Sequence, residues 1–228
     1  MLFDRLKKRL KRTEAKKYFG LNGLDSLIER FVNYENGFFV ELGANDGLTQ
    51  SNTAYFEKSR GWKGVLIEPS PNKFLECIKN RSEKNHYACA ACVDFEYHSR
   101  YVDMTYANLM TISSNVSGDI EDVEGHVNKG KQFLRGHEVV FQYGALARTL
   151  NSILKEASAP PVIDLLSLDV EGVELNVLRG VDFKEFNFKN IVVETREIDR
   201  LMEALTPLNY QLKEKLTHHD YLLTLKGS

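Results

Sequence analysis

The chain has 228 residues, enough for one domain with a sizeable core, and its hydrophobic content of 43% is ordinary for a globular protein. Its formal net charge of -2 argues against a surface built for nucleic acid, so we expect no nucleic-acid partner. Its 3 cysteines do not suit a disulfide framework, which favours a reducing compartment and a cytoplasmic location.

Residues 1–36 are predicted to form a basic N-terminal helical extension. Leu2, Leu6 and Leu10 recur at helical spacing and place one narrow apolar stripe on a segment crowded with Lys and Arg. Such a helix is either a solvated extension or an arm that touches a partner or the anionic inner surface of a membrane. No run of about 18 apolar residues occurs, so no membrane-spanning helix is expected.

Residues 37–228 begin with alternating strands and helices. Short apolar runs predict buried parallel strands at Phe38–Leu42, Gly64–Ile67 and His86–Cys92. Ser51 and Ser70 precede the intervening helices as N-cap residues. This order favours a parallel sheet with right-handed crossovers.

Residues 93–136 are less regular and are predicted to form a loop-rich insertion at the substrate mouth. After the insertion the alternation of strands and helices resumes, which predicts one doubly wound α/β domain over residues 37–228. The expected elements are a strand at Val139–Phe141, a helix at Leu146–Glu156, a strand at Val162–Leu168, a helix at Glu171–Leu178, a strand at Asn190–Val193, a helix at Ile198–Leu205 and a closing strand pair at Tyr210–Lys213 and Tyr221–Leu225.

Acidic residues lie at the ends of four of these apolar runs. They are Glu41, Glu68, Asp169 and Glu194. In an open α/β sheet, ligands bind outside the carboxyl ends of the strands. Turns favour polar residues in any protein, but four carboxylates at equivalent strand ends predict a ligand site there.

The turn after the first strand has the composition of a cofactor-binding loop. Gly43 and Gly47 flank Asn45, and all three tolerate positive φ, which lets backbone approach a ligand closely. Glu68 lies one helix and one strand further on, where a carboxylate can bind both ribose hydroxyls of an adenosine.

Electrostatics distinguish between two adenosine cofactors. The glycine fingerprint of nicotinamide-binding proteins is absent, and Glu41 and Asp46 beside the turn would repel a pyrophosphate. The same charges suit a ligand that carries an ammonium and a sulfonium group. The sequence therefore favours S-adenosylmethionine over NAD.

The chain also resembles the FkbM-type methyltransferase family over residues 37–225. The resemblance is carried by FVELGANDG at residues 39–47, SNT at 51–53, GWKGVLIEP at 61–69 and, most specifically, LDVEGVELNVLRG at 168–180. It implies a Rossmann-like class I methyltransferase fold, with a mostly parallel seven-stranded sheet, an antiparallel closing strand and helices on both faces. It also implies S-adenosylmethionine as cofactor and O-methylation of hydroxyls on sugars, polyketides or related natural products.

The resemblance further implies which residues bind the cofactor. The motif positions that would surround its methionine part, with their neighbours in the turn, are Glu41, Gly43, Ala44, Asn45, Asp46, Gly47 and Ser51. Glu68, followed by Pro69, would bind the ribose.

Three further carboxylates are predicted to act in catalysis. An alcohol is a poor nucleophile while protonated, so a base near the hydroxyl helps. Asp169 and Glu171 follow the central strand, and either could accept the proton; Glu194 ends the next strand. Asp169 and Glu194 could alternatively hold Mg²⁺ or Mn²⁺, and Glu171 could simply complement a helix dipole. We interpret the scattered histidines, including His126, as structural or surface residues.

Three functions are consistent with these patterns. The first is O-methylation of a small-molecule or glycan substrate with S-adenosylmethionine. The second is oxidoreduction with NAD, against which the missing glycine fingerprint argues. The third is a non-catalytic module on a methyltransferase-like scaffold, against which the intact Asp46, Glu68 and Asp169 argue.

Overall fold

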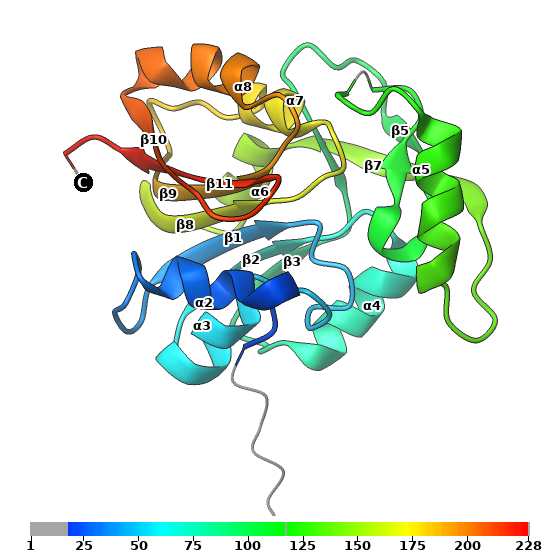
Figure 1. Ribbon diagram of the computed structural model, residues 1–228, viewed down its shortest axis with the longest axis horizontal. Helices are drawn as coiled ribbons and strands as arrows, with labels where there is room; N and C mark the ends of the chain where they lie inside the picture. Colours follow the sequence, from blue (N-terminus) through cyan, green and yellow to red (C-terminus); the bar gives the residue numbers. More distant parts are fainter. Residues whose placement is uncertain (1–17, 117, 228) are drawn as a thin grey trace, which may run out of the picture.

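The computed structural model describes residues 18–116 and 118–227, so the predicted stripe at Leu2, Leu6 and Leu10 lies outside the described residues. Seven strands form the main sheet in the order β10-β11-β9-β8-β1-β2-β3 (Figure 1). They are β1 (Phe38–Leu42), β2 (Lys63–Ile67), β3 (His86–Ala88), β8 (Val162–Leu168), β9 (Asn187–Glu194), β10 (Tyr210–Lys215) and β11 (Asp220–Leu225). Strand β11 pairs antiparallel with both β9 and β10, and the other pairings are parallel. The predicted α/β fold is confirmed.

Helices cover both faces of this sheet. Val40 and Leu42 of β1 pack in one core cluster with three helices, and Phe39 packs in another cluster with three different helices. This division follows from the strand geometry, because successive side chains point to opposite faces. The first group is α6 (Leu150–Glu156), α7 (Glu174–Arg179) and α8 (Ile198–Leu205), and the second is α2 (Leu24–Glu29), α3 (Ala54–Arg60) and α4 (Pro71–Asn80).

A second sheet of four strands stands beside the first, in the order β4-β7-β5-β6 (Figure 1). Its strands are β4 (Ala91–Val93), β5 (Tyr101–Tyr106), β6 (Ile112–Ser113) and β7 (Phe141–Thr149). The segment expected to be a loop-rich insertion supplies β5, β6 and the helix α5 (Val123–Gly130). Short 3-10 turns complete the chain: η1 (Leu21–Gly23), η2 (Asn108–Met110), η3 (Lys131–Phe133) and η4 (Thr206–Leu208).

Several predicted elements are wrong. The predicted strand 139–141 overlaps β7 only at Phe141. The run 86–92 is two strands, because β3 pairs with β2 whereas β4 pairs with β7 in the other sheet. The predicted helix 146–156 begins only at Leu150, since β7 continues to Thr149, pairing first with β5 and then, from Ala147, with β4. The Thr149 hydroxyl then accepts a hydrogen bond from Ser152 N and caps α6.

The strand order places one topological switch point in the main sheet. The chain moves outward from β1 through β2 to β3 and then returns to the other side of β1 as β8. The carboxyl ends of β1 and β8 therefore lie side by side, which is where open α/β sheets bind their ligands. Among the described helices, none combines the length and hydrophobicity that crossing a bilayer requires.

Candidate active site

The turn after β1 is held by left-handed backbone and by bonds to β2. Gly43, Asn45 and Gly47 have φ of 75°, 46° and 80°. The backbone N–H groups of Gly43 and Ala44 both donate to the carbonyl of Ile67, each at 3.1 Å. The turn therefore exposes backbone toward the ends of β1 and β2, where a ligand can approach it without meeting a side chain.

Asp46 uses its carboxylate inside this turn. The carboxylate accepts hydrogen bonds from Leu48 N at 2.9 Å, from Thr49 N at 2.6 Å and from the Thr49 hydroxyl at 2.6 Å. Burial raises the pKa of Asp46, but these hydrogen bonds outweigh it and the net shift is downward. Asp46 is thus an ionised group that fixes the shape of the loop.

Glu41 is buried beneath the same loop together with a guanidinium that the sequence analysis did not identify. Its carboxylate accepts from Ser51 Oγ at 2.9 Å, from Thr53 Oγ1 at 2.6 Å and from Arg81 Nη1 at 3.1 Å. Arg81 also donates to the carbonyl of Gly47 at 3.1 Å. Since the Arg81 side chain is fully buried, this ion pair holds both ends of the loop from below.

Glu68 joins the loop to the end of β2. One carboxylate oxygen accepts from Asn45 N and the other from Ser70 N, both at 2.8 Å. Burial raises the pKa of Glu68, although both hydrogen bonds oppose this shift. Each oxygen keeps a second lone pair, so the carboxylate can still accept hydrogen bonds from a diol.

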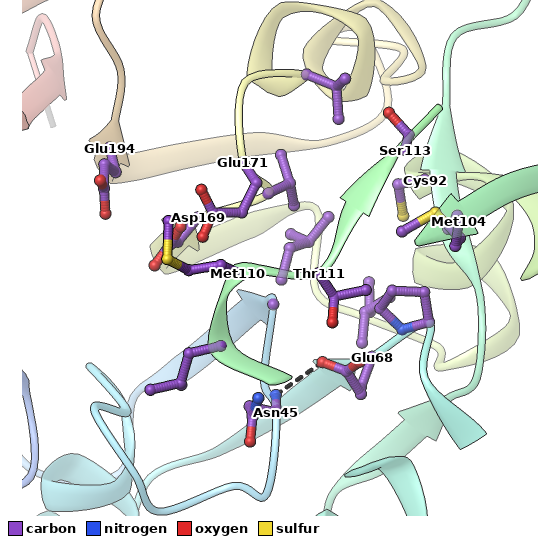
Figure 2. Close-up of a pocket in the computed structure, with 18 of the residues that line it drawn as sticks. Asn45, Glu68, Cys92, Met104, Met110, Thr111, Ser113, Asp169, Glu171 and Glu194 are labelled. Carbon is purple, nitrogen blue, oxygen red and sulfur yellow. Dashed lines mark hydrogen bonds between the residues drawn. The ribbon is translucent and has the colours of Figure 1, made fainter. Parts of the chain in front are cut away.

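The carboxyl ends of the strands enclose one cavity of about 390 Å³ (Figure 2). In Figure 2, Asn45 and Glu68 lie on one side of it, Asp169 and Glu171 on another, and Met110 between them. The cavity brings together these predicted residues: Gly43, Asn45, Ser51, Glu68, Pro69, Asp169, Glu171 and Glu194. Four other predicted residues, Glu41, Ala44, Asp46 and Gly47, do not line it.

One end of the cavity is apolar. Ala90, Ala91 and Cys92, where the chain passes from β3 to β4, face it together with Val102 and Met104 of β5. Burial raises the pKa of Cys92 to about 12, so this thiol stays neutral. This end lies next to Glu68 and has the apolar lining that suits a flat heterocycle.

The opposite end of the cavity is acidic. Asp169 follows β8 and Glu194 ends β9, and neither carboxylate has a hydrogen-bond partner among residues 18–116 and 118–227. Burial, then the charges of Glu194 and Glu171, raise the pKa of Asp169 well above its ordinary value. Burial, then Glu194, raise the pKa of Glu171 to about 8. A carboxyl group with a pKa of about 8 exchanges its proton close to neutral pH, as an acid–base group requires.

Glu171 does not lie in a helix, contrary to the predicted helix 171–178. It has φ of 55° in a tight turn, and α7 begins at Glu174. The Glu174 carboxylate accepts a hydrogen bond from Gly172 N at 3.0 Å, so Glu174 takes the stabilising role at the helix start. The interpretation of Glu171 as a helix-dipole residue is therefore wrong.

The segment after β5 covers the cavity. Asn108 accepts a hydrogen bond from Asn45 Nδ2 at 3.4 Å and donates one to Glu138 at 2.6 Å. Glu138 in turn pairs with the buried Lys73 of α4 at 2.8 Å. These contacts place Met110 over the cavity. A lone Asn in an irregular segment gives no sequence signal for this role.

The described carboxylates are not grouped as a metal centre. Within the described ranges, no group of three or more His, Cys, Asp or Glu side chains has an arrangement that could hold a metal ion. The predicted alternative of Mg²⁺ or Mn²⁺ at Asp169 and Glu194 is therefore not supported.

Comparison with known proteins identifies the family. Residues 41–223 match the family model described as "Methyltransferase FkbM domain". The chain is similar to "Methyltransferase 1" of Beauveria bassiana (strain ARSEF 2860), with 24% identity over 168 residues. That match covers 70% of this chain and 65% of the relative, so the chain spans less than two thirds of the relative's length.

Two solved structures also resemble the chain. A fibrillarin/Nop5p complex aligns with a TM-score of 0.39 and 11% identity over 83% of this chain and 71% of that one. A SAM-dependent methyltransferase from Geobacter sulfurreducens in complex with S-adenosyl-L-homocysteine aligns with a TM-score of 0.38 and 8% identity over 89% and 69%. The family model, which covers most of the chain, is the decisive match. The chain belongs to the FkbM methyltransferase family.

Proposed function

We propose that this chain uses S-adenosylmethionine to methylate a hydroxyl oxygen on a sugar, a glycan or a small natural product. The observation that carries the proposal is one cavity shared by two kinds of group. The turn at Gly43–Gly47 and Glu68 contribute a cofactor side, and the unpartnered Asp169 and Glu194 contribute an acidic side.

The cofactor side suits S-adenosylmethionine better than NAD. The apolar wall at Ala90–Cys92 fits an adenine, and Glu68 has lone pairs for the ribose hydroxyls. The carboxyl oxygens of Asp169 and Glu194 at the other end suit a sulfonium cation, whose charge would favour their ionised forms, whereas a pyrophosphate would oppose that ionisation. NAD-dependent oxidoreduction is the alternative that calorimetry with each cofactor would reveal.

The acidic side suits an alcohol acceptor. When bound, S-adenosylmethionine supplies a methyl group on a sulfonium that leaves as a neutral thioether. The residues of the chain orient the hydroxyl in line with that methyl group and remove its proton. Asp169 or Glu171 takes this proton, so the oxygen forms its new bond to carbon as the proton passes to a carboxylate.

The test is methyl transfer from labelled S-adenosylmethionine to a panel of sugars and polyols. Asp169→Asn should lower kcat by about 100-fold or more while the Kd for S-adenosylhomocysteine changes little. The matched control is Asp199→Asn on α8, where the aspartate is exposed and away from the cavity.

Two outcomes would contradict the proposal. If the protein binds NAD and not S-adenosylhomocysteine, the oxidoreductase alternative replaces it. If it binds S-adenosylhomocysteine but methylates no hydroxyl compound, the chain is better explained as a non-catalytic module on a methyltransferase-like scaffold. We further propose that the protein is cytoplasmic and that its basic N-terminal segment contacts a membrane surface or a partner.

A further inference from the structure

His126 is a buried histidine that the proposed reaction does not yet use. It lies in the middle of α5 and is 6% exposed. Its Nε2 atom is buried and has no hydrogen-bond partner among the described residues. Oε2 of Glu171 lies 3.4 Å from it. A buried polar nitrogen without a partner is costly, so its position beside a carboxylate requires an explanation.

The other ring nitrogen fixes the tautomer. The ring is hydrogen-bonded to the backbone of Met110, and this bond favours the protonated ring. Met110 N already donates to the carbonyl of Ala107, so the carbonyl of Met110 is the group that faces the ring. A carbonyl only accepts, so Nδ1 carries the hydrogen and, in the neutral ring, Nε2 presents its lone pair to Glu171.

Groups from several elements set the charge of this pair. Burial, followed by the charges of Arg196 and Lys129, lowers the pKa of His126, which keeps the ring neutral. Around Glu171, the charges of Glu194, Glu174 and Asp119 favour the protonated carboxyl, and Arg196 opposes them. Asp169 belongs to the same interacting group. The two side chains therefore make a hydrogen bond only when one proton lies between them.

We propose that His126 is a positioning residue for methyl transfer: it orients Glu171 and takes up a proton from Glu171 as Glu171 removes one from the acceptor hydroxyl. The inference rests on the proposed function. The hydroxyl oxygen forms the bond to the methyl carbon, and the carbon–sulfur bond breaks with its electron pair going to sulfur. Glu171 begins with the one proton of the pair; it passes that proton to Nε2 of His126 while its other oxygen takes the hydroxyl proton, which leaves an imidazolium beside a neutral carboxyl group.

The backbone supports this arrangement. Glu171 has φ of 55° and Gly172 has φ of 99°, so the turn is in a conformation that the surroundings must enforce. The carbonyl of Gly172 accepts a hydrogen bond from Asp119 N at 2.9 Å. This contact joins the turn to the segment that leads into α5, and it keeps Glu171 between His126 and the cavity.

The first experiment needs no turnover. Long-range ¹H–¹⁵N spectra of the full-length protein report the tautomer of all 6 histidines. His126 is expected to appear as the Nδ1–H tautomer, and Glu171→Gln should shift its Nε2 resonance and its titration midpoint while the other rings stay unchanged. An unchanged His126 resonance in Glu171→Gln would overturn the pairing, whether or not an acceptor has been found.

The second experiment measures turnover. His126→Gln keeps a polar side chain of similar length but cannot take up a proton, so kcat should fall by about 100-fold. The KM for the acceptor and the Kd for S-adenosylhomocysteine should stay within about twofold, because neither ligand touches His126. His98→Gln, in an exposed loop, is the matched control.

The outcomes separate this inference from the proposed function. If wild type methylates a hydroxyl and His126→Gln does so at the same rate, the role of His126 is overturned and the function stands. If wild type methylates no hydroxyl, the proposed function fails and His126 has no proton to accept from an acceptor. A loss of kcat alone, together with the shifted ring resonance, supports both.

Discussion

A Cβ atom on Gly43 would lie 2.0 Å from the carbonyl oxygen of Asp169, so the turn after β1 rests directly on the backbone that ends β8. The two halves of the site are thus in backbone contact. A shift of the turn at Gly43 would therefore move the Asp169 carboxylate that faces the acceptor. The main chain fixes the position of the turn relative to this carboxylate.

Gly43→Ala should therefore disrupt both stability and cofactor binding. The substitution places a Cβ against backbone at a φ of 75°, and neither the strain nor the clash can be relieved by a side-chain movement. We expect a loss of affinity for S-adenosylhomocysteine of more than about 10-fold by calorimetry, since the turn must shift. Gly23→Ala is the control, because Gly23 also has φ of 75° but nothing within 4 Å. Equal effects of the two variants would show that strain alone is responsible.

Arg81→Leu should destabilise the protein strongly. It would leave Glu41 and Glu57 buried without their shared cation. Breaking a buried ion pair in this way typically costs about 3–5 kcal/mol. Thermal unfolding should show a drop in Tm well beyond that of Arg30→Leu, whose exposed pair with Glu214 is worth at most about 1 kcal/mol. A Tm drop no larger than that of Arg30→Leu would contradict the assigned role of the buried pair.

Glu68→Gln should weaken cofactor binding with little loss of packing. The amide has the same shape, but its NH₂ group must face one of the two N–H donors, Asn45 N or Ser70 N. We expect S-adenosylhomocysteine to bind about 10- to 100-fold more weakly, since a charge-assisted hydrogen bond to the ribose is lost. The control is Glu76→Gln on α4, where the carboxylate is about half exposed. Equal Kd values for Glu68→Gln and wild type would remove Glu68 from the cofactor site.

Much of the main sheet was predictable because its strands are locally distinct. Each central strand is a short apolar run that stops at a turn residue, which is Gly43 after Leu42 and Asp169 after Leu168. The parallel pairing then brings those ends together without further information. The split after Ala88 was not predictable, because the apolar run continues through Cys92 while the hydrogen-bonding partner changes from β2 to β7. Local pattern carries no information about which strand is the neighbour.

The residues that support the site are less predictable from the sequence than those that line it, because their roles depend on tertiary contacts. Ala145–Ala147 has good helix propensity, but pairing with β5 and β4 makes it a strand, because tertiary contacts override propensity. Arg81 follows a surface helix, and its burial arises only where the glycine turn closes over it. The role proposed for His126 depends on its contact with Glu171, which is 45 positions away in the sequence. Such pairings are set by the fold rather than by spacing.

Glu171→Gln should stabilise the protein without ligand, and the gain should grow with pH. The ordinary pKa of 4.5 is raised to about 8 in the folded protein, so the folded state holds this proton more tightly. The stability that this proton confers is complete below about pH 4.5 and is lost as the pH rises through about 8. At about pH 8.5 the variant should gain about 2 kcal/mol, or roughly 4–8 °C in Tm, because neighbouring carboxylates share the shift.

The measurement is thermal unfolding of both proteins from about pH 5 to about pH 8.5. Near pH 5 the two Tm values should nearly coincide, since Glu171 is then mostly protonated in the folded protein and resembles glutamine in charge. Glu197→Gln, at an exposed position of the same charge type, should show no such trend. A gain that is the same at both ends of the range would mean that the fold does not raise the pKa of Glu171, and it would contradict the proton assigned to Glu171 in the unliganded site.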